Sequence, residues 1–374
     1  MIYLDNNATT RPTAEVSSII SKCLKETFGN PSSGHPFGVN AREAVDRARK
    51  EVANLVGARP DEIIFTSGGT EANNMAIMGT ALKHSSGHII TSAIEHPSVM
   101  NPLRYLEALG YNVTYLPVDK YGMVDPADVI KNAKKNTLLI TIMHSNNETG
   151  TIQPIARIGE IARGKGIYFH CDAAQSVGKV PINVKKLNTN ILTIVSHKFY
   201  GPKGVGALYL NRGAEIKPIT FGASHERGLR PGTENVCSIA GLGKACELAK
   251  KEMRTRVSGM KSLSKLFYAE LKKQIPGLKL NGHPSKRLPN TLNLSFPGVM
   301  GSALLEKAKN DIAASTGSAC HEGMHTASHV LKAMGLSDKD AFSAVRLSLG
   351  RTTTKSQVRK AVKAIVRAYL ALSS

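Results

Sequence analysis

The sequence predicts an α/β protein in which a large domain with a mainly parallel sheet precedes a smaller α+β domain. Two observations support this fold class. Short apolar runs alternate with segments of helical periodicity up to about residue 200, which is typical of βαβ units. After Thr233 the alternation gives way to a long helical run over 238–274 and only two further strands. We place the boundary near residue 250, so that residues 11–250 form the large domain and residues 1–10 and 251–374 the small one.

Each predicted element rests on a local pattern. Residues 1–10 are expected to be an extended arm, and Arg11-Pro12 opens a helical pattern that ends near Gly29. Apolar residues recur at helical spacing over 39–56, and short apolar runs rich in β-branched residues predict buried strands. The predicted strands of the large domain are 63–65, 88–92, 113–116, 137–143, 167–170 and 191–195, and its further helices are 72–82, 97–109 and 154–162. In the small domain we expect strands at 291–296 and 345–349 and a basic helix at 355–372.

The composition indicates a globular protein. The chain has 374 residues and 41% hydrophobic content, without an apolar run near the roughly 18 residues of a membrane span and without the pattern of a secretory signal. We therefore expect a cytoplasmic protein that does not enter the membrane. The five cysteines are scattered and form no CxxC pair, which argues against a disulfide framework or a structural zinc site and leaves at least one as a candidate working thiol.

The net charge of +21 is unusual for a metabolic enzyme. Such a surface attracts polyanions such as tRNA or DNA. The basic residues are spread through helices without interleaved aromatic side chains, and aromatic content is only 5%. We therefore expect a solvated basic surface whose contacts with nucleic acid are not specific.

Polar residues follow the predicted strands at the points where the strands end. In open α/β sheets, ligands bind outside the carboxyl ends of the strands, so these loops are expected to meet around one site. The strand ends carry Ser67, Gly69 and Thr70, then Glu95 and His96, then residues 144–148, then residues 172–175, and finally Ser196, His197 and Lys198.

Lys198 lies between the apolar run 191–195 and a Gly/Pro-rich turn. Burial at a strand end disfavours the charged form of a lysine and makes its amine available for a Schiff base with an aldehyde such as pyridoxal 5′-phosphate (PLP). A surface lysine is the plainer interpretation in a chain with 49 Lys and Arg residues. The assignment therefore depends on finding the other parts of a PLP site.

Those parts stand at the other strand ends. Asp172 can pair with a pyridine nitrogen, the His96 ring can stack on the pyridine, and Gln175 can contact a ring hydroxyl. Gly69 and Thr70 lie in the turn that leads from a predicted strand into the predicted helix 72–82, where backbone N–H groups at a helix N-terminus hold phosphate. Each residue also has a plain role as a helix cap or helix start. Their joint occurrence favours a PLP site.

At these positions the chain resembles the class V aminotransferase-fold PLP enzymes, and within them the NifS/IscS cysteine desulfurases. The motifs that carry the resemblance lie at 3–10 (YLDNNATT), 28–33 (FGNPSS), 67–74 (SGGTEANN), 95–96 (EH), 146–150 (NNETG), 172–176 (DAAQS), 197–198 (HK), 230–235 (RPGTEN), 315–320 (STGSAC) and 346–350 (RLSLG). The resemblance covers nearly the whole chain and implies PLP fold type I.

The resemblance also implies a role for each site residue. Lys198 would carry the Schiff base, His96 would stack on the ring and move protons, and Asp172 would pair with the ring nitrogen. Asn147 and Gln175 would contact the ring substituents. The phosphate would be held by Gly69, Thr70, Ser196, His197 and Thr233, with Thr233 reaching across from the other subunit of a homodimer. Arg346 would bind the substrate carboxylate, which suits its bidentate guanidinium.

Cys320 is the nucleophile that the resemblance implies. Its thiolate would take sulfur from L-cysteine, leaving L-alanine and a Cys320 persulfide. The expected partners are then an acceptor protein, either an iron–sulfur scaffold or a tRNA-thiolating enzyme, that receives the sulfur from the loop after Cys320. We expect no stable metal site, and a transient iron–sulfur contact through Cys320 stays open.

Two features depart from the family pattern. Val195 stands three residues before Lys198, where the family usually has serine, so one phosphate hydroxyl is missing or is replaced by Ser196. Residues 321–325 (HEGMH) match the HExxH pattern of zinc proteases. A central glycine and a loop context oppose a zinc site there, because that site needs a stable helix and a third ligand.

Other functions remain open on the sequence alone. Within the same fold these are a selenocysteine lyase or another class V lyase, and a sulfur donor for DNA phosphorothioation. From a different class, a basic nucleic-acid-binding protein that has lost PLP chemistry is opposed by the intact Lys198, Asp172, His96 and Cys320.

Overall fold

A seven-stranded sheet organises the larger half of the computed structural model, which describes residues 1–316 and 327–373. The strands lie in the order β2-β8-β7-β6-β5-β3-β4, and only β8 runs antiparallel to its neighbours. The mainly parallel α/β fold predicted from the sequence is confirmed. The strand bounds are β2 (Ile63–Thr66), β3 (His88–Ser92), β4 (Asn112–Leu116), β5 (Thr137–Thr141), β6 (Tyr168–Asp172), β7 (Ile191–Val195) and β8 (Gly206–Leu210).

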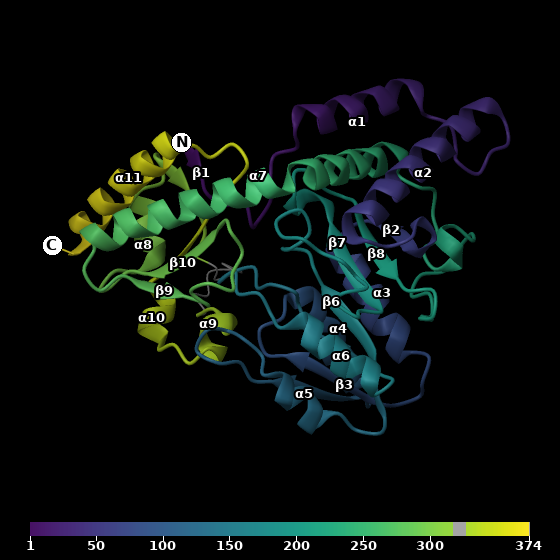
Figure 1. Cartoon of the computed structure of the whole chain (residues 1–374), viewed down its shortest axis with the longest axis horizontal. Coiled ribbons are helices and arrows are strands. Elements are labelled where there is room, and N and C mark those ends of the chain that lie inside the picture. The colour runs from purple at the N-terminus through teal and green to yellow at the C-terminus, as the bar shows by residue number, and fades with distance from the viewer. Residues whose placement is uncertain (317–326, 374) are drawn as a thin grey trace.

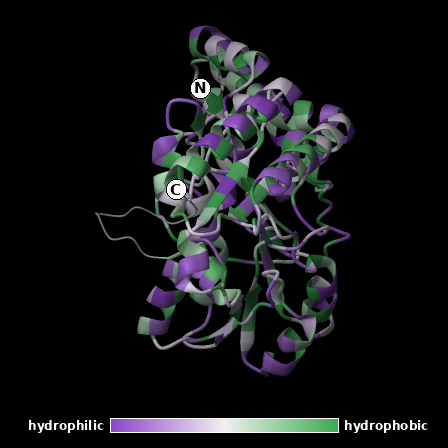
Figure 2. Cartoon of the chain, turned by 90° about the vertical axis from the view of Figure 1, so that its left-hand side faces the viewer, coloured by the Kyte–Doolittle hydropathy of each residue, from purple (hydrophilic) through white to green (hydrophobic). Residues whose placement is uncertain are grey.

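Helices cover the sheet, and several of them present an apolar stripe to it. Figure 2 shows hydrophilic and hydrophobic residues alternating along the outer helices. Side chains of Thr13, His35, His96 and Asp125 cap the starts of α1, α2, α4 and α5. The helices of this half are α1 (Ala14–Glu26), α2 (Pro36–Val56), α3 (Gly69–Ala81), α4 (Pro97–Ala108), α5 (Pro126–Asn132) and α6 (Ile155–Gly164), with 3₁₀ turns η1 (Pro60–Glu62), η2 (Ser196–Lys198) and η3 (Glu226–Gly228).

Helix α7 (Val236–Gln274) runs from the larger half into the smaller one (Figure 1). It packs on α1 and α2 at one end and on α11 (Lys355–Ser373) at the other. The hydrophobic core of the larger half includes Ala249 of this helix, while Phe267 belongs to the core of the smaller half. A domain boundary near residue 250 stays a prediction that this division of the two cores supports.

The smaller half contains both the N-terminal and the C-terminal segments of the chain (Figure 1). Strands β12 (Ala344–Ser348), β10 (Thr291–Ser295) and β9 (Lys279–Asn281) form an antiparallel sheet, and β1 (Ile2–Tyr3) pairs in parallel with β11 (Ile312–Ala313). Short helices complete it: α8 (Gly301–Lys307), α9 (His329–Ala333) and α10 (Asp338–Phe342). Within the described ranges, no helix combines the length and the apolar content needed to cross a bilayer.

Strand β8 is the main element that the sequence pattern did not predict. It starts at Gly206, and Gly/Pro-rich residues 201–206 favour a loop. Glycine is required there because a Cβ would lie 2.7 Å from the Ile194 oxygen and 2.9 Å from the Gly68 Cα. This close packing brings the turn after β2 beside the end of β7.

Candidate active site

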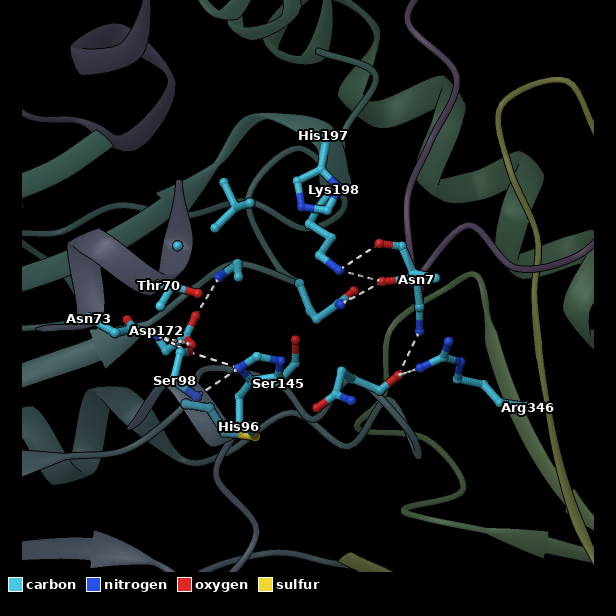
Figure 3. A pocket seen from close by; sticks show the side chains of 17 residues that line it. Asn7, Thr70, Asn73, His96, Ser98, Ser145, Asp172, His197, Lys198 and Arg346 are labelled. Carbon is cyan, nitrogen blue, oxygen red and sulfur yellow. Dashed lines mark hydrogen bonds between the residues drawn. The ribbon is translucent and has the colours of Figure 1, made fainter. Parts of the chain in front are cut away.

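A cavity of about 380 Å³ lies at the carboxyl ends of β2, β3, β5, β6 and β7. The strand-end loops therefore meet, as parallel strands of one sheet require. In Figure 3, Asp172 and Thr70 lie on one side of this cavity and Arg346 on the other. Nine of the residues predicted from the sequence line it: Gly69, Thr70, His96, Asn147, Asp172, Gln175, His197, Lys198 and Arg346.

The Lys198 amine is held by the N-terminal arm. Its Nζ donates to the carbonyl oxygens of Asn7 at 2.9 Å and Ala8 at 2.7 Å, and in Figure 3 the side chain points toward Asn7. Burial lowers the pKa of Lys198 to about 8, and the positive charge of Arg346 acts in the same direction. The neutral amine, which is the nucleophilic form, is therefore populated closer to neutral pH than in an exposed lysine.

Asp172 ends β6 and presents a buried carboxylate. Its Oδ2 accepts a hydrogen bond from Asn73 Nδ2 at 2.8 Å, and its Oδ1 accepts one from the backbone N–H of Ala174 at 2.9 Å. These two donors fix the carboxylate in the cavity wall. A fixed carboxylate suits a partner that carries a ring N–H.

His96 caps α4 with its ring at the cavity wall. The backbone N–H of Ser98 donates to its Nδ1 at 3.1 Å, so in a neutral ring the proton resides on Nε2. Burial lowers the pKa of His96, and Lys198 and His329 add to the effect, while Asp172 opposes it. The ring is thus a neutral, oriented plane with one exchangeable proton.

The start of α3 provides the candidate phosphate end of the cavity. Gly69 begins the helix, and a Cβ there would lie 2.6 Å from Val195 Cγ2. Val195 itself lines the cavity, so the wall is apolar where the family pattern has a serine. Thr70 follows with its side chain at the cavity, where the N-terminus of a helix favours anions.

His197 stands beside the same end. Its Nδ1 lies 3.1 Å from Thr9 Oγ1. Burial lowers its pKa to about 4, with Lys198, Lys203 and Lys179 acting in the same direction. The ring is therefore neutral near pH 7 and can donate one N–H to a ligand.

Arg346 enters the cavity from β12 of the smaller half. Its Nη2 donates to Asp5 Oδ1 at 2.7 Å, and its Nη1 donates to the Asn147 carbonyl at 3.2 Å. Its Nε is buried and has no hydrogen-bond partner among the described residues. A buried N–H without an acceptor is costly, so Nε is the group that an incoming carboxylate would satisfy.

Three predicted residues are not placed in the cavity wall. The Ser196 side chain is fully buried, and its hydroxyl has no partner in the described chain and lies where a Cβ on Gly201 would approach to 2.1 Å. The geometry thus gives no support for Ser196 as the replacement hydroxyl. Thr233 is exposed and does not line the cavity. Cys320, like the HExxH match at 321–325, lies outside the described residues.

Four polar lining residues were not predicted as site residues: Asn7, Asn73, Ser98 and Ser145. Asn73 lies one helical turn after Gly69 and reaches Asp172, and Ser98 follows His96 by two residues, so their spacing from predicted site residues was the available signal. The four cysteines in the described chain, Cys23, Cys171, Cys237 and Cys246, are free thiols. Within the same ranges, no group of three His, Cys, Asp or Glu side chains is arranged to hold a metal ion.

The family model described as "Aminotransferase class-V" matches residues 2–360. The chain belongs to the class-V aminotransferase family. Among curated members, the "Cysteine desulfurase IscS" of Dictyoglomus turgidum is 48% identical over 369 residues, which span 98% of this chain and 94% of that protein.

Solved structures of class-V aminotransferase relatives superpose closely. A "NifS-like protein" has a TM-score of 0.93 at 36% identity and covers 99% of this chain and 100% of its own. A structure described as "SspA in complex with cysteine" has a TM-score of 0.83 at 37% identity, over 93% of this chain and 99% of its own.

Proposed function

We propose that this class-V aminotransferase-family protein is a PLP-dependent cysteine desulfurase that transfers the sulfur of L-cysteine to Cys320. The observation that carries the proposal is one cavity that combines the Lys198 amine, the Asp172 carboxylate and the unpartnered Nε of Arg346. The names of the relatives agree: one is a cysteine desulfurase, and another was solved with cysteine. The names of these relatives do not favour the alternatives of a selenocysteine lyase or another class V lyase.

The cavity residues fit PLP. Lys198 would bind the aldehyde carbon, Asp172 would accept the N–H of the pyridine, and the neutral His96 ring would cover one face. Thr70, His197 and the backbone at Gly69 would hold the phosphate, and Asn147 and Gln175 would contact the ring substituents. When bound, PLP supplies an electron sink that stabilises negative charge at the substrate α-carbon.

The residues of the chain then divide the work. Arg346 would bind and orient the substrate carboxylate through Nε and Nη2, which requires Asp5 to share or release Nη2. When substrate is bound, the carbonyl oxygens of Asn7 and Ala8 would hold the free amine of Lys198, which already donates to both. In that position the amine can take a proton from the substrate α-carbon and return one.

Cys320 would act only on the sulfur. Its thiolate would attack the sulfur of the bound cysteine. The carbon–sulfur bond would break with its electron pair left on the substrate β-carbon, which takes a proton, so the products are L-alanine and a Cys320 persulfide. The described residues on either side are anchored beside the cavity: Ser315 pairs with the backbone of Arg346, and Ser328 Oγ donates to Glu148 Oε2 at 2.5 Å.

A homodimer would complete the phosphate end. A second hollow, of about 620 Å³, lies between α3 and α4 and shares Thr70, His96 and Ser98 with the cavity. Thr233 is exposed in its own chain. In a dimer, the partner subunit's Thr233 would reach the phosphate through this hollow.

The sulfur acceptor would be a protein of iron–sulfur cluster assembly or of tRNA thiolation in the cytoplasm. The net charge of +21 favours electrostatic attraction to acidic partners and to nucleic acid. DNA phosphorothioation is the other destination for the sulfur, and no described contact favours it. A transient iron–sulfur contact through Cys320 would accompany transfer to a scaffold protein.

Incubation of the PLP-loaded protein with L-cysteine and a reductant tests the function. We expect alanine and sulfide in equal amounts, because each turnover moves one sulfur. Alanine release from L-selenocysteine but not from L-cysteine would contradict the proposal. To identify the acceptor, the reaction is repeated with radiolabelled L-cysteine and with a scaffold protein or a tRNA-thiolating enzyme in place of the reductant. The acceptor is the protein to which the labelled sulfur is transferred.

Arg346→Gln is expected to lower kcat/KM for L-cysteine by about 10- to 100-fold, mainly through a higher KM. The reason is the loss of charged hydrogen bonds to the substrate carboxylate, each of which is worth roughly 1.5–3 kcal/mol. Steady-state kinetics of alanine release measure the effect. Arg351→Gln is the matched control, because Arg351 lies near the same sheet but pairs with Glu252. An unchanged KM for Arg346→Gln would show that this arginine does not bind the carboxylate.

A further inference from the structure

Lys179 is a buried lysine that belongs to no predicted site. Its side chain lies beside the cavity wall, only 4% of the residue is exposed, and it forms no ion pair with a carboxylate in the described chain. Its two hydrogen-bond partners are side-chain amide oxygens: Nζ donates to Gln175 Oε1 at 2.8 Å and to Asn7 Oδ1 at 3.1 Å. Burying an amine without a counter-ion costs folding free energy, so a functional role for its two contacts would account for keeping a lysine here.

The first contact fixes the orientation of the Gln175 amide. The N–H groups of Lys179 require an acceptor, so Oε1 of Gln175 must face Lys179. The carbonyl of Asn7 requires a donor, and Gln175 Nε2 donates to it at 2.9 Å. Two independent partners thus exclude the flipped amide. The second N–H of Nε2 is the donor that Gln175 has left for a ligand.

The second contact fixes the arm that holds Lys198. Asn7 Oδ1 accepts from both Lys179 and Asn290 Nδ2, and Asn7 Nδ2 donates to Thr291 Oγ1 at 2.9 Å and to the Asn147 carbonyl at 3.1 Å. With its side chain held in this way, the backbone carbonyl of Asn7 faces Lys198 and accepts its Nζ. Lys179 therefore acts on the Gln175 amide by direct contact and on the Lys198 amine through Asn7.

We propose that Lys179 is a positioning residue that holds Gln175 as a hydrogen-bond donor toward the cofactor and Asn7 as the acceptor of the Lys198 amine. The inference rests on the proposed PLP function. It predicts that the ligand atom beside Gln175 is an acceptor, such as the ring oxygen of PLP in its deprotonated form. A protonated ring hydroxyl could not donate to Gln175, because the Oε1 atom that would accept its hydrogen faces Lys179 instead.

The electrostatic setting is compatible with this role. Burial lowers the pKa of Lys179 well below its ordinary value, and the positive charges of Lys198 and Arg346 lower it further. A neutral amine keeps two N–H groups, which is the number that the two contacts use. In the neutral form the amine could also accept a hydrogen bond, so the Asn7 carbonyl is then the partner that excludes the flipped amide of Gln175.

Lys179→Met is expected to weaken PLP binding about tenfold, because the variant leaves the buried Oε1 of Gln175 without a donor and frees Gln175 to rotate. The visible band of the loaded protein should also shift its pH midpoint, since the hydrogen bond to the ring oxygen is lost. Dialysis equilibrium and a spectrophotometric pH titration measure the two effects. Lys203→Met is the matched control, because it removes an exposed lysine that also acts on His197, and it should behave as the wild type.

A double-mutant cycle separates positioning from a general loss of stability. In the Gln175→Ala background, Lys179→Met should weaken PLP binding by about twofold or less, because only the contact of Lys179 with Asn7, which Asn290 also holds, is left to lose. The same tenfold weakening in both backgrounds, or none in the wild type, would overturn the inference. If Lys179→Met does not fold, as judged by thermal unfolding of the PLP-free protein, Lys179→Gln and Lys179→Ala replace it. Lys179→Gln keeps a donor and should weaken PLP binding less than Lys179→Ala does.

Measurements on the wild-type protein distinguish a failure of the proposed desulfurase function from a failure of the proposed role of Lys179. A wild-type protein that shows no visible PLP band and releases no alanine would contradict the proposed function itself. A wild type that shows both, with a Lys179→Met protein that is indistinguishable from it, would contradict only the role of Lys179.

Discussion

Lys198→Ala is expected to abolish the visible absorption of the PLP-loaded protein and to lower alanine release from L-cysteine by at least about 10³-fold. Alanine has neither the amine that binds the aldehyde nor a group that moves the α-proton. PLP should still enter the cavity, because Asp172, Thr70 and His197 do not depend on the amine, but it should leave on dialysis. Absorption spectra before and after dialysis measure the first effect, and quantification of alanine measures the second.

Lys203→Ala is the control for Lys198→Ala. Lys203 is exposed and follows Lys198 in the same Gly/Pro-rich turn, so its removal changes the local charge and leaves the cavity intact. We expect normal absorption and turnover. A Lys198→Ala protein that stays yellow after dialysis would place the covalent attachment on another amine, for which the buried Lys179 is the first to examine.

Cys320→Ser is expected to lower alanine and sulfide release by at least about 10³-fold while PLP binding stays normal. Serine keeps the size and polarity of the side chain but lacks the readily ionised, polarizable thiolate. The spectrum should still change when L-cysteine is added, because substrate binding to the cofactor uses Lys198 and Arg346. This combination separates the cofactor chemistry from the sulfur chemistry.

Radiolabelled L-cysteine locates the persulfide. In the wild type, label that a reductant removes should lie on the tryptic peptide that contains Cys320, and none should lie there in Cys320→Ser. Cys237→Ser is the control, because Cys237 is half-buried while Cys23, Cys171 and Cys246 are buried. Burial raises the pKa of Cys171 and of Cys246, so these two thiols are poor nucleophiles. Label on one of the four other cysteines would overturn the assignment.

The strands that the sequence predicted best are those with an unbroken apolar run between turn residues. Strands β3 and β7 have the predicted bounds, His88–Ser92 and Ile191–Val195, because β-branched residues fill their centres and a turn-forming glycine or asparagine precedes them. Strand β8 was missed because its first residue is a glycine that serves tertiary packing, which no local pattern reveals. Helix α5 and the short elements of the smaller half were missed because they span few residues and depend on tertiary contacts.

Site residues were predictable where they follow a recognisable strand. Asp172, His96 and Lys198 each stand at the end of one, so the fold class alone brings them together. Asn7 and Lys179 were not predicted for the opposite reason. Asn7 lies in an arm without periodicity, and Lys179 is one lysine among 49 basic residues until the structure places it beside Gln175.

The pairing of the N-terminal arm with the smaller half has a consequence for the order in which the protein folds during synthesis. Domains generally fold as units, beginning with those nearest the N-terminus. The larger sheet can therefore form while the ribosome is still translating the last hundred residues. The arm cannot settle then, since the backbone N–H of Asn7 donates to Ser348 Oγ, 341 residues later. Closing such a long loop is a late event. The newly made chain would thus have a folded sheet before the carbonyl groups of Asn7 and Ala8 are in position to hold Lys198. Tight retention of the cofactor would then begin only when the C-terminal strand has folded.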